Sequence, residues 1–339
     1  MDTLTDHSSY IELLALSDRQ LLEVDAKSLK TQIYQASTFQ DEGMWTDELM
    51  EYISKMTLSD LPLLEWVTEK HYAAKLRDSS MQRYFEHFHL IGYIRVTFLR
   101  LLHTSNMGYT NDDLHFVLAA LKKHYNNALE STRILDIGCG TGELLTELCI
   151  RGYSQVEGTD ISPRAIHLTK DRLNGHKVRR VECMSFEDYA RSSSAMAYDV
   201  IMHSDVIEHI APFPLSLFLE EVRRLLKPHG LMIVMTPSKL TGPHDSTRRF
   251  EPSSTEPLGF HLREFFLSEL EEILLDSGFE HLETVASLPS LNEHGASLSE
   301  ENFRTKLQLE KCLMSTDREL RKPLVDGMYF KGLVCQKLP

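Results

Sequence analysis

The sequence has no long apolar run and no excess of basic residues, and each absence excludes a class of partner. No run of apolar residues approaches the ~20 that a membrane-spanning helix needs. The 36 Lys and Arg are outnumbered by 50 Asp and Glu, which gives a net charge of -14. This charge would repel the phosphates of nucleic acids and of anionic membranes, so the composition argues against both as partners.

The cysteine content is also low, and the cysteines show no spacing typical of a disulfide framework or a metal site. Five cysteines occur, at positions 139, 149, 183, 312 and 335, without a C-x-x-C pair. This usage fits a reducing compartment better than secretion. The first residues, MDTLTDHSSYIELL, lack the basic region that begins a signal peptide. We therefore expect a cytoplasmic protein.

Residues 1–125 are expected to form an all-α domain. Segments such as DLPLLEWVTEKHYAAKL carry apolar residues at three- and four-residue spacing, which is the period of an amphipathic helix. The first fifty residues hold ten Asp or Glu against three Lys or Arg. This acidic bias indicates either a solvated face or a surface for a basic partner.

Strands alternate with helices from Arg133 onward, which predicts a mostly parallel sheet with helices on both faces. We expect an α/β fold over residues 126–339, with a Rossmann-like, doubly wound sheet of seven strands. The polar segment 290–325 interrupts the last pair of strands and is expected to be a helical insertion. The seven expected strands cover 133–138, 155–162, 178–184, 198–204, 231–237, 281–288 and 328–338.

A glycine-rich turn follows the first expected strand, in LDIGCGTGELL. Glycines at 138, 140 and 142 allow a sharp bend and let a ligand approach the backbone without interference from a Cβ atom. Asp160 lies about twenty residues later at the end of the second strand, where a carboxylate can accept hydrogen bonds from ribose hydroxyls. The glycines alternate as G-x-G-x-G, which differs from the G-x-G-x-x-G of dinucleotide sites. Asp136, just before them, suits a ligand with a cationic amino acid group.

These segments, together with GTDIS, YDVIMHSDVIEHI and LLKPHGLMIVMTP, resemble the motifs of class I S-adenosylmethionine-dependent methyltransferases. The resemblance covers about residues 130–339. It implies that S-adenosylmethionine is the cofactor, with its methionine end at Asp136 and the glycines, its ribose at Asp160 and its adenine beside Ile161. The residues that the resemblance assigns to cofactor binding are Asp136, Gly138, Cys139, Gly140, Gly142, Asp160, Ile161, Ser185, Phe186, Ser204 and Asp205.

The stretch HSDVIEHI, residues 203–210, holds two carboxylates and two histidines beyond the fourth strand, and three interpretations remain open. Asp205 as an N-cap with Glu208 three residues later fits a capping box at a helix start. His209 or a neighbouring group also fits a base that removes a proton from the methyl acceptor. The candidate catalytic residues are Glu208 and His209, together with His261 from the loop after the fifth strand.

The third interpretation is a metal site made of Asp205, Glu208, His209 and His261. Carboxylates and imidazoles suit Mg, Mn, Fe or Zn, and the sequence does not choose among them. The arrangement resembles the metal site of small-RNA 3′-terminal 2′-O-methyltransferases and of some ubiquinone-pathway O-methyltransferases, although Asp205 stands where the RNA enzymes have Glu. We expect His209 and His261 to border the acceptor pocket without a tightly bound metal.

The expected function is methyl transfer from S-adenosylmethionine to a small-molecule metabolite, with region 1–125 as a lid and specificity domain. Two alternatives stay open: metal-assisted 2′-O-methylation of RNA 3′ ends, and a catalytically inactive, methyltransferase-like interaction module. The net charge argues against the RNA substrate. The intact glycine turn and Asp160 argue against the inactive module. The sequence predicts neither the acceptor atom nor the oligomeric state.

Overall fold

The computed structural model describes residues 111–125, 128–161, 163–210, 212–245, 247–258, 261–287 and 297–339. The predicted helical domain over 1–125 therefore lies outside the described residues, except for its last helix, α7 (Asn111–Tyr125). Among the described residues, no helix is both long enough and apolar enough to cross a membrane.

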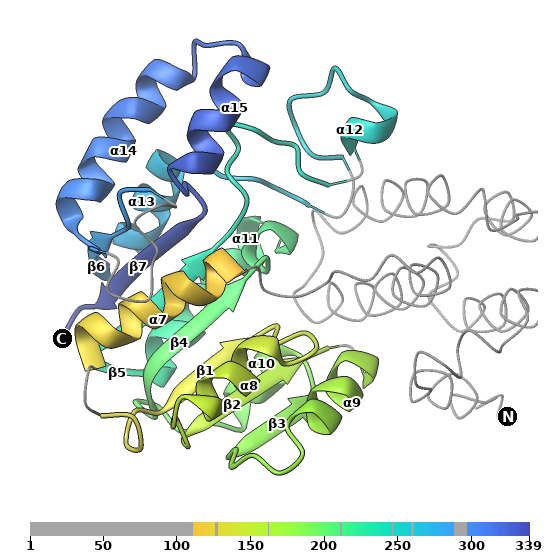
Figure 1. The fold of residues 1–339 in the computed structure, drawn as a ribbon, viewed down its shortest axis with the longest axis vertical. Coiled ribbons are helices and arrows are strands. Elements are labelled where there is room, and N and C mark those ends of the chain that lie inside the picture. Colours follow the sequence, from red (N-terminus) through yellow and green to blue (C-terminus); the bar gives the residue numbers. More distant parts are fainter. Residues whose placement is uncertain are drawn as a thin grey trace, which may run out of the picture.

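Seven strands form one sheet in the order β3-β2-β1-β4-β5-β7-β6 (Figure 1). The neighbouring pairs among β1 to β5 are parallel, whereas β7 is antiparallel to both β5 and β6. This topology confirms the predicted Rossmann-like α/β fold. The strands are β1 (Ile134–Ile137), β2 (Val156–Asp160), β3 (Arg180–Cys183), β4 (Tyr198–Ser204), β5 (Leu226–Met235), β6 (Phe279–Glu283) and β7 (Gly332–Lys337).

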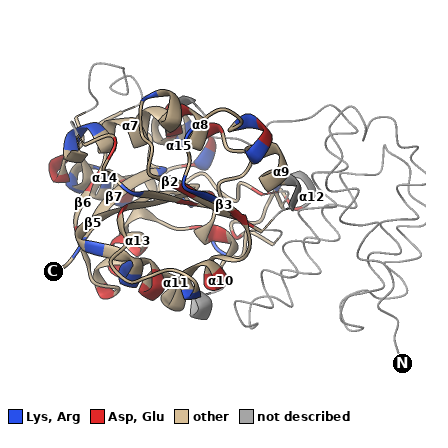
Figure 2. Ribbon diagram, turned by 90° about the horizontal axis from the view of Figure 1, so that it is seen from below, with Lys and Arg blue, Asp and Glu red and all other residues tan. Residues whose placement is uncertain are grey.

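Helices cover both faces of the sheet (Figure 2), which explains why its central strands are apolar along most of their length. The core therefore consists of two apolar layers, one on each face. One layer joins α7 to α8 (Glu143–Ile150) and α9 (Pro163–Arg172), and the other joins α10 (Phe186–Arg191), α11 (Pro212–Leu225) and α13 (Leu267–Asp276).

Two helices, α14 (Glu300–Leu313) and α15 (Arg318–Gly327), lie between β6 and β7 in the sequence. They coincide with the expected insertion at 290–325, except that α15 extends two residues beyond it. A buried carboxylate fastens α14 to the start of α13. The two oxygens of Glu310 accept the backbone N–H of Leu267 at 2.5 Å and that of Ser268 at 2.9 Å. Glu310 therefore satisfies two N–H groups that a helix start leaves without partners.

Lys306 of α14 is also buried, and no carboxylate of the described residues pairs with it. Its Nζ donates to Thr284 Oγ1 at 3.1 Å and to the Tyr329 carbonyl at 2.8 Å. Burial lowers the pKa of Lys306 to about 7, from the ordinary value of 10.5. Between these two values the unfolded chain binds a proton that the folded chain has released. The free energy of unfolding should therefore rise with pH across this window.

We expect this rise to depend on Lys306 itself. From about pH 7 to about pH 9, the free energy of unfolding in urea should increase by roughly 2 kcal/mol more in the wild-type protein than in Lys306→Met. Lys311→Met, which changes an exposed lysine of the same helix, is the control and should follow the wild-type curve. Parallel curves for the wild type and Lys306→Met would show that burial does not lower the pKa of this ammonium group.

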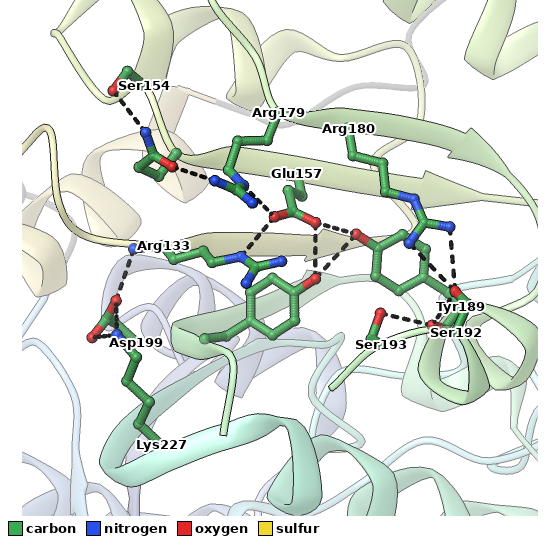
Figure 3. Close-up of polar contacts among 12 residues, drawn as sticks. Arg133, Ser154, Glu157, Arg179, Arg180, Tyr189, Ser192, Ser193, Asp199 and Lys227 are labelled. Carbon is green, nitrogen blue, oxygen red and sulfur yellow. Dashed lines mark hydrogen bonds and ion pairs between the residues drawn. The ribbon is translucent and has the colours of Figure 1, made fainter. Parts of the chain in front are cut away.

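A buried carboxylate also ties the strands together at the amino-terminal edge of the sheet (Figure 3). One oxygen of Glu157 accepts hydrogen bonds from Arg133 Nε at 2.7 Å and Arg179 Nε at 3.0 Å. The other accepts the hydroxyls of Tyr189 at 2.7 Å and Tyr198 at 2.9 Å. Burial disfavours the charged form, but the hydrogen bonds outweigh it and lower the pKa of Glu157. The network stabilises the amino-terminal edge of the sheet. The candidate active site lies at the opposite edge, at the carboxyl ends of the parallel strands.

Candidate active site

The carboxyl ends of the parallel strands meet at one edge of the sheet, where ligands bind in open α/β proteins. The glycine turn follows β1 at this edge. Gly138, Gly140 and Gly142 have φ of 70°, 54° and 80°, a left-handed conformation that favours residues without a Cβ atom. The Thr159 carbonyl of β2 accepts the Gly138 N–H at 2.8 Å, and Thr169 Oγ1 of α9 donates to the Gly140 carbonyl at 2.8 Å. The turn is therefore fixed to two neighbouring elements.

The turn leaves open space in front of Gly140. A Cβ atom built on Gly138 would meet Val206 Cγ2 at 2.7 Å, and one on Gly142 would meet Thr169 Cγ2 at 2.7 Å. A Cβ atom on Gly140 would meet no atom of the described residues within 4 Å. The turn is thus packed on both sides and open at its centre, as a backbone cradle for a ligand requires.

Asp160 ends β2 directly beside this turn. Its Oδ2 accepts the Gly140 N–H at 3.0 Å. The segment after β3 lies next to it, because the Asp160 carbonyl accepts the Met184 N–H at 3.1 Å. Ser185 follows and caps α10 by accepting the Asp188 N–H at 3.1 Å. The structure therefore brings Asp160, predicted to hold the ribose, close to Ser185, predicted to border the adenine.

Several residues predicted at the cofactor site have buried side chains. Asp136, Cys139 and Phe186 are all at most 2% exposed. Cys139 belongs to one apolar layer of the core and so offers its backbone, rather than its thiol, to the turn. The ring of Phe186 packs on that of Phe218, with centroids 4.8 Å apart. His203 is also buried, neither of its ring nitrogens has a hydrogen-bond partner among the described residues, and burial lowers its pKa to about 3.

Of the three interpretations, the one in which Asp205 caps a helix is not supported by the structure. Asp205 has a left-handed φ of 53°, and only the 3-10 helix η2 (Ile207–His209) follows, with Val206 as its N-cap and no side-chain capping bond. The Asp205 carboxylate instead accepts a hydrogen bond from Lys331 Nζ at 3.0 Å. Lys331 also donates to Asp113 of α7 at 3.0 Å. Asp205 therefore belongs to an ion-pair cluster that joins the turn after β4 to α7 and to the start of β7.

Glu208, His209 and His261 come together beyond the ends of β4 and β5. One candidate ligand atom from each lies within 4.8 Å of the other two. The His209 and His261 rings meet edge to face, with centroids 4.9 Å apart. The Glu208 carbonyl accepts the N–H of Leu262 at 2.7 Å, which fastens the segment that carries His261 to η2. Three of the four residues that the metal interpretation would use therefore converge, and Asp205 does not join them.

Sequence reasoning missed Glu264, which is fully buried behind His261. Its Oε1 lies 2.7 Å from His261 Nδ1 and accepts the His244 N–H at 2.5 Å, and its Oε2 lies 3.0 Å from His244 Nδ1. A Cβ atom at Gly242 would overlap Oε2, so glycine at that position makes room for the carboxylate. The H-x-x-E spacing of His261 and Glu264 is the available signal in the sequence, but a charged residue in a long loop is usually solvated.

Burial and hydrogen bonding set the protonation of these groups. Burial raises the pKa of Glu208 to about 8. Its Oε2 accepts a hydrogen bond from the Thr236 hydroxyl at 2.9 Å, and its Oε1 has no hydrogen-bond partner among the described residues. Burial opposes a charge on Glu264 too, but hydrogen bonds from His244 and His261 outweigh it and lower the pKa of Glu264 to about 2. Burial also opposes a charge on His261, yet its bond to Glu264 and the nearby carboxylates produce a net rise in its pKa.

Known proteins share this domain. The family described as a methyltransferase domain matches residues 104–284, just over half of the chain. A probable S-adenosylmethionine-dependent methyltransferase of Mycolicibacterium smegmatis is 30% identical over 171 residues, which cover 49% of this chain and 61% of that protein. A ubiquinone biosynthesis O-methyltransferase of Cereibacter sphaeroides is 37% identical over 107 residues, which cover 32% of this chain and 42% of that protein. A crystal structure of an S-adenosylmethionine-dependent methyltransferase from Archaeoglobus fulgidus aligns with 65% of this chain and 93% of its own, at 20% identity and a TM-score of 0.41.

The family match agrees with the features described above. The chain spans less than two thirds of the length of either sequence relative, so the relatives identify the domain rather than the whole protein. The matched residues include the glycine turn, Asp160 and the Glu208–His209–His261 group. The chain belongs to the class I S-adenosylmethionine-dependent methyltransferases.

Proposed function

We propose that the protein transfers the methyl group of S-adenosylmethionine to a hydroxyl group of a small molecule. The observation that carries this proposal is the convergence of Glu208, His209 and His261 within 4.8 Å, at the edge of the sheet that also holds the glycine turn. A hydroxyl is a weak nucleophile until it loses its proton, so an O-acceptor needs a base or a metal at this place. The relative from Cereibacter sphaeroides, named a ubiquinone biosynthesis O-methyltransferase, supports an oxygen acceptor.

The residues around the glycine turn fit the cofactor. The open space at Gly140 admits a ligand to the backbone, and the Asp160 carboxylate stands beside it for the ribose hydroxyls. Ile161 and Ser185 would border the adenine, while Asp136 and the N–H groups of the turn would face the methionine end. The residues that would hold the cofactor are thus Asp136, Gly138, Cys139, Gly140, Gly142, Asp160, Ile161, Ser185, Phe186, Ser204 and Asp205.

Bound S-adenosylmethionine supplies an electrophilic methyl group on a positively charged sulfur. The protein holds the acceptor oxygen in line with that methyl group and excludes water from it. His261 receives the hydroxyl proton, because Glu264 occupies its Nδ1 and leaves Nε2 for the acceptor side. His209 and Glu208 line the same space and orient the hydroxyl.

A divalent metal ion at the same residues is the second candidate arrangement. The specific observation in its favour is that His261 is backed by a buried carboxylate, which is the usual partner of a metal-bound histidine. A site of one carboxylate and two imidazoles would leave positions for the acceptor oxygen. Loss of activity on chelation would distinguish this metal arrangement from a histidine base.

We expect Asp160 to contribute to cofactor affinity in two ways. Asp160→Ala removes both the proposed ribose contact and the acceptor of the Gly140 N–H, and should weaken S-adenosylmethionine binding by about 1.5–3 kcal/mol in calorimetry. Asp160→Asn keeps an oxygen for the Gly140 N–H and should show a smaller loss. Unchanged affinity in both variants would place the ribose elsewhere.

Transfer of a radiolabelled methyl group tests the proposed function. The full chain is incubated with methyl-labelled S-adenosylmethionine and a panel of small phenols and enols, each paired with its amine and thiol analogue. We expect label in the hydroxyl compounds and an O-methyl product by mass spectrometry. Label confined to amines, thiols or RNA ends would overturn the assignment of the acceptor.

A further inference from the structure

Two histidines share one buried carboxylate behind the acceptor side of the site. Glu264 is 0% exposed, and its oxygens lie 2.7 Å from His261 Nδ1 and 3.0 Å from His244 Nδ1. An ionised carboxylate can only accept hydrogen bonds. Each of these Nδ1 atoms must therefore carry the proton of its hydrogen bond to Glu264.

A neutral imidazole with its proton on Nδ1 has a lone pair on Nε2. His244 shows this consequence, because its Nε2 lies 3.0 Å from the Thr241 hydroxyl, which can donate to that lone pair. In His261 the Nε2 atom is the only ring nitrogen left for the group formed with Glu208 and His209.

We propose that Glu264 is a positioning residue, which holds His261 in the Nδ1–H tautomer so that its Nε2 lone pair faces the acceptor. The catalytic meaning of this assignment rests on the proposed function, whereas the tautomer of His261 can be measured without an acceptor. Glu264 itself is not expected to contact the acceptor, because both of its carboxylate oxygens are hydrogen-bonded to His244 and His261.

Glu310 offers a matched case of a buried carboxylate with a structural role. It is 1% exposed, and its oxygens accept the backbone N–H groups of Leu267 and Ser268. Glu264→Leu and Glu310→Leu therefore make the same chemical change at two buried sites. Only the first change alters a histidine, since leucine offers no acceptor to Nδ1 of His261 and so no longer holds the proton there. Glutamine is unsuitable, because its amide oxygen would stay with the His244 N–H and would still accept from His261 Nδ1.

The tautomer is read by nitrogen NMR of the full chain with ¹⁵N-labelled histidine, in a pH series that is raised until the His261 signals no longer shift, because burial is outweighed by Glu264 and the nearby carboxylates, which raise the pKa of His261. The His261 signals are assigned by their loss in His261→Asn. We expect the proton on Nδ1 in the wild type, and loss of this preference in Glu264→Leu, where Nδ1 has no acceptor. A wild-type His261 with its proton on Nε2 would overturn the proposal, whatever the variants do.

Turnover supplies the second readout. With saturating S-adenosylmethionine, Glu264→Leu should lower kcat by about 10²–10⁴-fold while the affinity for the cofactor is unchanged. Glu310→Leu should lower the melting temperature and keep kcat. Equal losses of kcat in the two variants, in step with their melting temperatures, would show that Glu264 is only structural. If the wild type transfers no methyl group to hydroxyl compounds, the proposed function fails, but the NMR result still decides the tautomer.

Discussion

Gly140→Val should abolish measurable binding of S-adenosylmethionine. The Cβ atom and its two methyl groups would project into the space in front of the glycine turn, where Gly140 now has no neighbour among the described residues within 4 Å. The variant would therefore obstruct the ligand rather than collide with the protein. We expect a loss of affinity of at least about 100-fold, roughly 3 kcal/mol, in isothermal titration calorimetry.

The control for this prediction is Gly175→Val. Gly175 lies in the turn before β3, has a left-handed φ of 86° and also has open space around it, so valine there meets the same backbone strain. Both variants should lose similar thermal stability, and only Gly140→Val should lose cofactor binding. Similar cofactor affinities in the two variants would contradict the assignment of the glycine turn.

His261→Ala should lower kcat by about 10²–10⁴-fold, which is the usual contribution of a base to catalysis. His209→Ala should also lower it, because the two rings are in contact at the same site. The affinity for S-adenosylmethionine should not change, since neither ring belongs to the glycine turn. Steady-state kinetics with a hydroxyl acceptor and calorimetry with the cofactor make these measurements.

His281→Ala is a suitable control, because His281 is also hydrogen-bonded through Nδ1 to a carboxylate, Glu300, but lies exposed on β6. Its kcat should equal that of the wild type. Dialysis against a chelator distinguishes catalysis by a histidine base from catalysis that needs a metal ion. We expect activity to persist after dialysis. Activity that disappears with the chelator and returns with Mg or Mn would establish the metal arrangement in place of the base.

The sequence predicts most of the fold because each local pattern agrees with the final structure. Strands β1 to β4 and β7 form within the predicted segments, whereas β5 begins at Leu226, before its predicted start at 231, and β6 overlaps its predicted segment only at residues 281–283. The glycine turn is equally predictable, since three left-handed φ values in five residues leave glycine as the favoured choice. Asp160 follows from the same motif, and the structure places it 3.0 Å from the Gly140 N–H.

The conformation of the turn after β4 could not be predicted from the sequence, because it depends on distant residues. Asp205 followed by Glu208 is a capping-box pattern, and local sequence favours a helix start there. In the folded chain Asp205 adopts a left-handed φ and pairs with Lys331, which lies 126 residues later in the sequence. An ion pair over that separation leaves no local signal, so the sequence offers the capping box as one interpretation although the folded chain does not form it.

Glu264 was missed for a related reason. A charged residue in the loop after β5 is expected to be solvated, and its burial depends on several residues at once. Gly242 makes room for the carboxylate, and His244 and His261 donate to it. These contacts join residues up to 22 positions apart within one loop, and periodicity contains no information about how such a loop folds.

A crystal structure of the full chain with S-adenosylhomocysteine tests the central claim most directly. We expect the ribose at Asp160 and the sulfur directed toward Glu208, His209 and His261. The distance from the sulfur to His261 Nε2 should be on the order of 7 Å, which leaves room for one methyl group and one acceptor oxygen in line. A sulfur directed away from these residues, with the two histidines outside the acceptor space, would contradict the account.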